Sequence, residues 1–89
     1  MSYLPLFIDT AGKACLIVGG GKIASRKLVP VLKSKMSVTI ISPDIIDEIK
    51  ENTINVKNFK YIQRKFVESD INNQFLVVAD KNVPKKLIK

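Results

Sequence analysis

The sequence predicts an α/β fold with a doubly wound parallel sheet, and three observations support this prediction. Short runs of β-branched and other apolar residues alternate along the chain with segments of helical apolar spacing. The first run, at 13–18, is apolar at successive positions without alternation, which is typical of a parallel strand covered on both faces. The run at 13–18 ends at three consecutive glycines, and a helical pattern follows them. Such a sheet is expected to have the strand order 3-2-1-4, with its ligand-binding edge at the carboxyl ends of strands one and four.

The expected elements follow one another with short connections. In chain order they are an apolar arm with a polar turn (1–12), a strand (13–18), a helix (22–34), a strand (37–41), a short helix (44–51), a strand (60–64), a helix or turn start at 69–70, a strand (75–79) and a helix start at 83–84. Pro30 lies inside the first helix, where its missing N–H predicts a bend. The fourth strand is too apolar for an exposed edge. We therefore expect this Rossmann-like sheet to be incomplete at the C-terminus and covered there by further chain or by a second subunit.

Length and composition bound the class of protein. With 89 residues, 46% of them hydrophobic and 26% charged, the chain has the size and composition of one globular domain. We divide it into the arm (1–12), a βαβ nucleotide-binding unit (13–44) and the remaining strands and helices (45–89). No apolar run approaches the roughly 20 residues that cross a bilayer, and the N-terminus lacks the features of a secretory signal. A cytoplasmic protein is expected.

Charge and cysteine content narrow the chemistry. The net charge of +7 favours an anionic partner such as a nucleotide, a nucleic acid or a polycarboxylate, with a lysine-rich solvated surface as the alternative. The chain has no histidine and one cysteine, which excludes a structural zinc site, an internal disulfide and an imidazole catalyst. Cys15 lies inside the first predicted strand and is expected to be a small apolar core residue rather than a nucleophile. We predict no metal site.

The glycine run carries the clearest functional signal. Gly19, Gly21 and Ala24 fit the pattern G-x-G-x-x-G/A between a strand and a helix, which is the context required of a dinucleotide-binding fingerprint. The first glycine permits a tight turn, the second lets a pyrophosphate approach the backbone, and the small alanine lets the helix pack on the strand. The helix N-terminus then faces the phosphates. The alternative is a glycine turn in a βα unit that binds nothing.

Several segments together resemble one family. They are Tyr3-Leu4-Pro5-Leu6-Phe7, Val18–Lys27, Val38–Asp44, Ile62–Phe66, Ser69–Ile71 and Phe75–Ala79. Over nearly the whole chain they resemble the N-terminal domain of siroheme synthases. These enzymes are NAD-dependent precorrin-2 dehydrogenases, and some are also sirohydrochlorin ferrochelatases. The resemblance implies that NAD accepts a hydride from precorrin-2 to give sirohydrochlorin in siroheme biosynthesis.

The resemblance also implies the cofactor-binding residues. They are Gly19, Gly20, Gly21, Lys22 and Ile23 for the pyrophosphate and adjoining ribose, and Pro43 and Asp44 for the adenosine. Asp44 lies about twenty residues beyond the fingerprint, where a carboxylate can accept the ribose hydroxyls and repel the 2′-phosphate of NADP. A helix N-cap is an alternative role for this residue.

Four basic residues are weaker candidates for the site. Arg26 and Lys27 are read as helix-surface charges, with the alternative that Arg26 ties the helix to the arm or to a bound carboxylate. Arg64 and Lys65 stand at the end of the third predicted strand, where they are either solvated charges or a frame for the adenine.

Asp80 is the candidate acid–base residue. The family usually has an aspartate shortly after the fourth strand, and this chain reads Ala79-Asp80-Lys81-Asn82 there, in a shorter segment. A loop or cap role is the alternative. The family continues into a dimerisation region and a helical part, so the resemblance implies a homodimer or a separate C-terminal partner. A non-catalytic nucleotide-binding regulatory module is the alternative function, and a nucleic-acid-binding domain is disfavoured, because the sequence shows no recognition helix or aromatic stacking surface.

Overall fold

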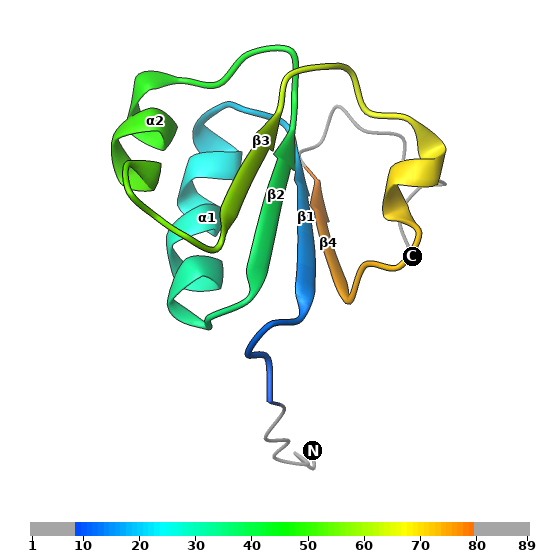
Figure 1. Ribbon diagram of the computed structural model, residues 1–89. Coiled ribbons are helices and arrows are strands. Elements are labelled where there is room, and N and C mark those ends of the chain that lie inside the picture. Colours follow the sequence, from blue (N-terminus) through cyan, green and yellow to red (C-terminus); the bar gives the residue numbers. More distant parts are fainter. Residues whose placement is uncertain (1–8, 80–89) are drawn as a thin grey trace, which may run out of the picture.

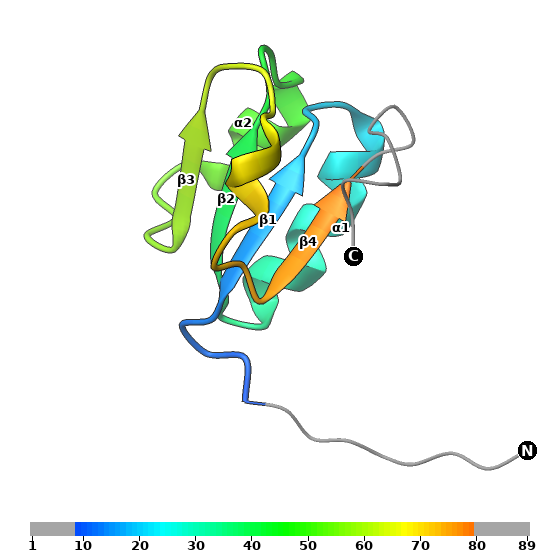
Figure 2. The ribbon, with the colours of Figure 1, turned by 90° about the vertical axis from the view of Figure 1, so that its right-hand side faces the viewer.

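The computed structural model describes residues 9–79, which form a four-stranded sheet covered by helices (Figure 1). The strands are β1 (Ala14–Val18), β2 (Ser37–Ile41), β3 (Phe59–Ile62) and β4 (Leu76–Ala79), and the helices are α1 (Lys22–Lys33), α2 (Asp47–Thr53) and the 3₁₀ helix η1 (Glu68–Ile71). The strands are parallel and their order is β3-β2-β1-β4. The predicted Rossmann-like fold and strand order are confirmed. In Figure 2 the segment with η1 lies in front of the sheet and α1 and α2 lie behind it.

β1 is the central strand of this sheet. It pairs with β2 along its whole length and with β4 from Cys15 onward. Cys15, Leu16 and Ile17 are fully buried, and Val18 is nearly so. Because the strand has a neighbour on each side and a covered face above and below, every position in it favours an apolar residue. The strands predicted at 13–18 and 37–41 are therefore confirmed as β1 and β2.

The helix-covered face holds the larger part of the core. Ala24 and Leu28 of α1 and Ile49 of α2 join the side chains of β1 and β2 in one buried cluster. The outer face of α1 carries exposed charges such as Lys27, so the helix is amphipathic, as its apolar spacing predicts. Pro30 lies inside α1, as expected. The bend predicted at this proline stays a prediction.

The opposite face is covered by the connection from β3 to β4. Leu16, Val18 and Ile41 are buried on this face, and Phe66 and Ile71 from the connection pack against them. A connection with one short 3₁₀ helix thus covers this face, whereas longer helices cover the other.

An ion pair fixes this connection. Arg64 donates two hydrogen bonds to the Asp70 carboxylate, with N–O distances of 2.8 and 2.6 Å. Asp70 also accepts the N–H of Val67 at 2.8 Å, and its side chain is only 11% exposed. Bidentate charge-assisted bonds to a mostly buried carboxylate hold more firmly than an ordinary surface pair. The helix or turn start predicted near Ser69 and Asp70 is confirmed as η1, whose N-cap residue is Val67; Asp70, at the third helical position, accepts the N–H of this N-cap residue.

Among the boundaries that differ from the prediction, two are explained by backbone hydrogen bonds. α2 begins at Asp47 rather than at 44, because Ile46 is extended and donates its N–H to the Gly20 carbonyl at 2.9 Å. β3 ends at Ile62 rather than at 64, because the chain turns there and the Arg64 N–H donates back to the Ile62 carbonyl at 3.1 Å.

β4 forms an edge of the sheet within residues 9–79, where it pairs only with β1. Phe75 and Leu76 are 50% and 40% exposed at its start, and the Lys13 ammonium lies 5.5 Å from the centre of the Phe75 ring. The cover expected for this edge, the arm before residue 9 and the helix start at 83–84 lie outside the described residues. No helix in the described part of the chain has the length and hydropathy of a membrane span.

Replacing Leu28 by alanine tests the core on the helix-covered face. Leu28 is fully buried, so Leu28→Ala is expected to lower the free energy of unfolding by about 2–5 kcal/mol. Lys27→Ala on the exposed side of the same helix is the control and should change it by less than about 0.5 kcal/mol. Urea unfolding of the three proteins measures both values. Equal effects of the two substitutions would contradict the packing described above.

The Arg64–Asp70 pair predicts a pH dependence of stability. The hydrogen bonds from Arg64, and after them the N–H of Val67, hold the pKa of Asp70 below its usual value of 3.8. A carboxyl with a lowered folded-state pKa stabilises the fold above its unfolded pKa, and this contribution is lost as the pH falls through the folded-state value. Asp70→Asn should therefore be less stable than the parent protein at neutral pH, and the difference should shrink below about pH 4.

Asp47→Asn is the matched control for this titration. Asp47 is highly exposed and lies 3.8 Å from the Lys50 amine, so its removal should leave the free energy of unfolding nearly unchanged at every pH. Urea unfolding between neutral pH and acid distinguishes the two variants. A constant difference between Asp70→Asn and the parent protein across this range would argue against the pair.

Candidate functional site

Two loops meet at the carboxyl edge of the sheet. The glycine loop (19–21) follows β1, and the Asp44 turn (42–44) follows β2. Gly19 has a φ of +116°, a conformation that side-chain-bearing residues rarely adopt, and its N–H donates to the Ile41 carbonyl at 3.1 Å. The tight turn that the sequence predicts at the first glycine is therefore present, and it starts directly against the end of β2.

Gly20 is the point at which the two loops touch. Its carbonyl accepts the N–H of Ile46 at 2.9 Å. A Cβ atom at this position would overlap the Asp44 carbonyl oxygen and lie 2.9 Å from the Ile45 side chain. The sequence predicts only a cofactor contact for Gly20, and this packing role was missed. The available signal was that glycine occupies even the variable position of the fingerprint.

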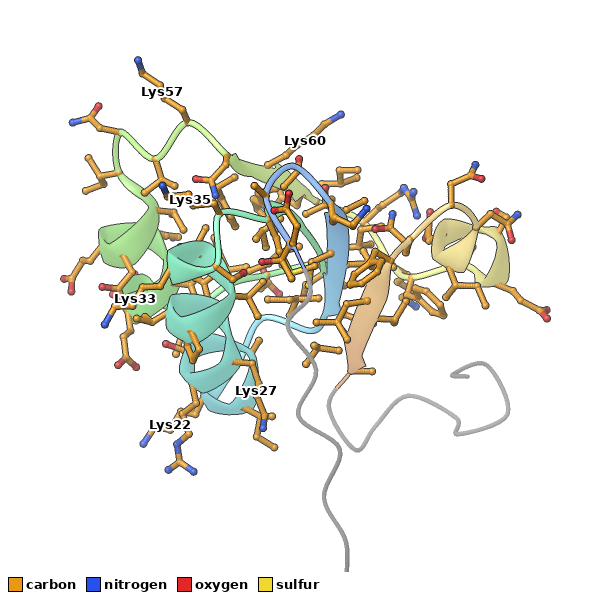
Figure 3. All side chains as sticks on the ribbon, turned by 90° about the horizontal axis from the view of Figure 1, so that it is seen from below. Lys22, Lys27, Lys33, Lys35, Lys57 and Lys60 are labelled. Atoms are coloured by element: carbon orange, nitrogen blue, oxygen red, sulfur yellow. The ribbon has the colours of Figure 1, made fainter. Side chains whose placement is uncertain are left out.

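Gly21 and the first turn of α1 form the open part of the loop. A Cβ atom at Gly21 would meet nothing within 4 Å. Gly21 is the N-cap residue and provides no side-chain cap, and the first turn holds no acidic residue. Lys22 begins the helix, and Figure 3 shows its side chain extending from this end of α1. Unsatisfied amides, the positive end of the helix dipole and a lysine together favour an anion in this space.

The remaining fingerprint positions are also placed as the motif requires. Ala24 is 2% exposed and belongs to the core cluster between α1 and the sheet. Ile23 is 38% exposed beside the open loop. The close helix–strand packing predicted for Ala24 is therefore present.

The Asp44 turn is held by three hydrogen bonds through Ser42. The Ser42 N–H donates to the Ile62 carbonyl at 3.3 Å, the Ser42 hydroxyl donates to the Asp44 carbonyl at 2.7 Å, and the Tyr61 hydroxyl donates to the Ser42 carbonyl at 2.9 Å. Pro43 and Asp44 are exposed at the tip of the turn. The turn is thus rigid at its base and presents a carboxylate to solvent at the edge that also carries the glycine loop.

The alternative role of Asp44 as a helix N-cap is wrong. The N-cap of α2 is Ile46, and no side chain caps the helix. The reason is the bond between Ile46 and Gly20, which keeps the chain extended past Asp44.

Tyr61 and Cys15 have shifted pKa values with simple causes. Burial, and secondarily the negative charge of Asp44, raise the pKa of Tyr61 above its usual value, so its hydroxyl remains a donor at neutral pH. Burial raises the pKa of the Cys15 thiol to about 11. A thiol with this pKa inside β1 carries almost no thiolate at neutral pH, which agrees with its predicted role as a core residue.

Within residues 9–79, the other candidates form no side-chain hydrogen bond with either loop. Arg26 and Lys27 are exposed on α1, in agreement with their alternative role as helix-surface charges. The arm, one of the partners considered for Arg26, lies outside the described residues. The Arg64 guanidinium is hydrogen-bonded to Asp70, so nothing in this arrangement supports a contact between Arg64 and the adenine. Lys65, the next residue, is exposed. Asp80 follows β4 directly but lies outside the described residues.

The positive charge of the chain is spread over several elements. Figure 3 shows the labelled lysines on α1, in the turn after it and on the β3 side of the molecule. Within residues 9–79 no three His, Cys, Asp or Glu side chains come together in a way that could hold a metal ion.

Comparisons with known proteins agree with this geometry. Residues 6–86 match the family model described as "Putative NAD(P)-binding". A siroheme synthase of Vesicomyosocius okutanii subsp. Calyptogena okutanii is 43% identical over 82 residues, which are 92% of this chain and 17% of that protein. The probable multifunctional siroheme biosynthesis protein HemA of Ruminiclostridium josui is 38% identical over 78 residues, which are 88% of this chain and 15% of that protein.

A solved structure gives the same result. SirC, a precorrin-2 dehydrogenase, superposes with a TM-score of 0.77 and 26% sequence identity, over 96% of this chain and 42% of the SirC chain. This chain therefore spans less than a fifth of the two curated relatives and less than half of SirC.

Alanine at each of two adjacent glycines separates the packing role from the open position. Gly20→Ala should lower the free energy of unfolding by about 1–3 kcal/mol or more, because the new methyl group overlaps the Asp44 backbone. Gly21→Ala should change it by less than about 1 kcal/mol, because its methyl group enters open space at a negative φ. Urea unfolding measures the difference. Equal destabilisation by both variants would contradict the contact at Gly20.

Proposed function

The chain belongs to the family described as "Putative NAD(P)-binding", and on this premise we propose that it binds NAD⁺ at the carboxyl edge of its sheet. The observation that carries the proposal is the open space at Gly21 in front of an α1 N-terminus without an acidic residue. We propose that residues 1–89 form one dinucleotide-binding domain, in which 13–44 is the nucleotide-binding unit.

Each loop has a proposed part in holding the dinucleotide. The backbone of Gly19, Gly20 and Gly21, with Lys22 and Ile23, contacts the pyrophosphate and the adjoining ribose. Pro43 and Asp44 border the adenosine, and the Asp44 carboxylate accepts the ribose hydroxyls. A carboxylate at this place repels a 2′-phosphate, which favours NAD⁺ over NADP⁺. The bond from Ile46 to Gly20 supports this proposal, because it fixes the two loops relative to each other.

The proposed reaction is the dehydrogenation of precorrin-2 to sirohydrochlorin in the cytoplasm. SirC is a precorrin-2 dehydrogenase, and the sequence relatives are siroheme synthases. Bound NAD⁺ supplies the hydride acceptor, and Asp80 is the proposed acid–base residue for the protons that leave. The net charge of +7 suits a polycarboxylate tetrapyrrole. We also propose that the protein works as a homodimer or with a separate C-terminal partner, as its resemblance to siroheme synthases implies.

A bulky side chain at Gly21 tests the cofactor site. Gly21→Val places its side chain where the pyrophosphate is proposed to lie, and isothermal titration calorimetry should show at least about a tenfold loss of NAD⁺ affinity, as expected when one well-made phosphate contact is lost. Ala11→Val, in the exposed turn before β1, is the matched control and should bind like the parent protein. Unchanged affinity of Gly21→Val, or absence of NAD⁺ binding by the parent protein, would refute the site.

Turnover is measured separately from binding. Incubation with NAD⁺ and precorrin-2 should form NADH if the protein is a competent dehydrogenase under these conditions. NAD⁺ binding without NADH formation would instead support the second candidate, a non-catalytic nucleotide-binding module.

A further inference from the structure

The Tyr61 hydroxyl takes the place of a backbone hydrogen bond that is missing just beyond the end of the β2·β3 pair. In the parallel pair β2·β3, the Ser42 N–H donates to the Ile62 carbonyl. A regular parallel ladder would continue with the N–H of Arg64 donating to the Ser42 carbonyl. The Arg64 N–H instead turns back to the Ile62 carbonyl at 3.1 Å. The Tyr61 hydroxyl donates to the Ser42 carbonyl at 2.9 Å and thereby replaces the missing bond.

From this carbonyl a series of contacts crosses the edge of the sheet from β3 to β1. The Ser42 hydroxyl donates to the Asp44 carbonyl at 2.7 Å. The Asp44 carbonyl lies against Gly20, where it leaves no room for a side chain. The Ile46 N–H then donates to the Gly20 carbonyl at 2.9 Å. Tyr61 on β3 therefore begins this series of contacts, and its hydroxyl holds the turn that carries Asp44.

The electrostatics agree with this placement. The negative charge of Asp44 contributes to the raised pKa of Tyr61, after the larger effect of burial. The phenol stays neutral at the pH of the cell and can donate throughout. Tyr61 is partly buried, and its ring packs against the core cluster on the helix-covered face.

We infer that Tyr61 is a positioning residue of the dinucleotide site, which through its hydroxyl holds the Ser42–Asp44 turn so that the Asp44 carboxylate faces the adenosine ribose. The inference rests on the proposed function and adds to it a residue that sets the preference for NAD⁺ over NADP⁺. Removing the hydroxyl frees the Ser42 carbonyl and loosens the turn, while the ring and the ligand-contacting residues remain.

Tyr61→Phe tests the inference by calorimetric titration with NAD⁺ and NADP⁺. NAD⁺ affinity should fall about three- to tenfold, the range expected for one hydrogen bond. NADP⁺ affinity should stay the same or rise, because the carboxylate that repels the 2′-phosphate is less firmly held. The ratio of NAD⁺ affinity to NADP⁺ affinity should therefore decrease. A role confined to folding stability would lower both affinities in parallel and leave this ratio unchanged.

Thr10→Val is the matched control. The Thr10 hydroxyl donates to the Ser34 carbonyl at 2.8 Å, so the variant also loses one hydroxyl-to-carbonyl bond, but at the opposite end of the sheet. Its affinity ratio should equal that of the parent protein. Should Tyr61→Phe fail to fold, Ser42→Ala removes the next bond in the series and should narrow the ratio in the same way.

The outcomes separate this inference from the proposed function. A parent protein that binds no NAD⁺ refutes the proposed function. A parent protein that binds NAD⁺, together with a Tyr61→Phe variant whose affinity ratio is unchanged, refutes the role of Tyr61 alone.

Discussion

The close approach of two backbones at Gly20 is the constraint on which the candidate site depends. Only hydrogen fits between the Gly20 Cα and the Asp44 carbonyl, and the Ile46 N–H closes the contact by donating to the Gly20 carbonyl. This contact sets where α2 begins and brings Ile45 and Ile46 against the core cluster. It also fixes the distance between the open loop at Gly21 and the exposed Asp44. The two loops therefore act as one surface rather than as two independent connections.

The fold could be predicted because its signals are local. The apolar runs, the glycines at 19–21 and the helical spacing after them each lie within a few residues, and they determine β1, α1, β2 and the strand order. The boundaries that were missed depend on hydrogen bonds that the apolar pattern of each segment does not encode. The start of α2 is set by the bond from Ile46 to Gly20, and the end of β3 is set where Arg64 turns toward Asp70. No periodicity within either segment records such a contact.

The candidate site likewise combines features that local sequence encodes with features that depend on contacts elsewhere in the chain. The fingerprint places Gly19, Gly21 and Ala24 correctly, because its spacing encodes a local turn and a local packing contact. The packing role of Gly20 depends on a residue more than twenty positions away and could not be predicted from the turn itself. Tyr61 is a common strand residue in sequence terms, and only the arrangement of neighbouring strands shows that its hydroxyl reaches Ser42. Asp44 was correctly placed after β2, but its alternative as a cap was wrong.

The thiol of Cys15 has a consequence for how the motions of this protein can be followed. It is the one sulfhydryl in the chain, it lies fully inside the central strand, and its pKa of about 11 leaves it inert while the strand stays covered. Alkylation therefore requires that β1 become exposed, which only large-scale opening of the sheet permits. The rate of Cys15 alkylation therefore reports the opening of the whole sheet, without any engineered label.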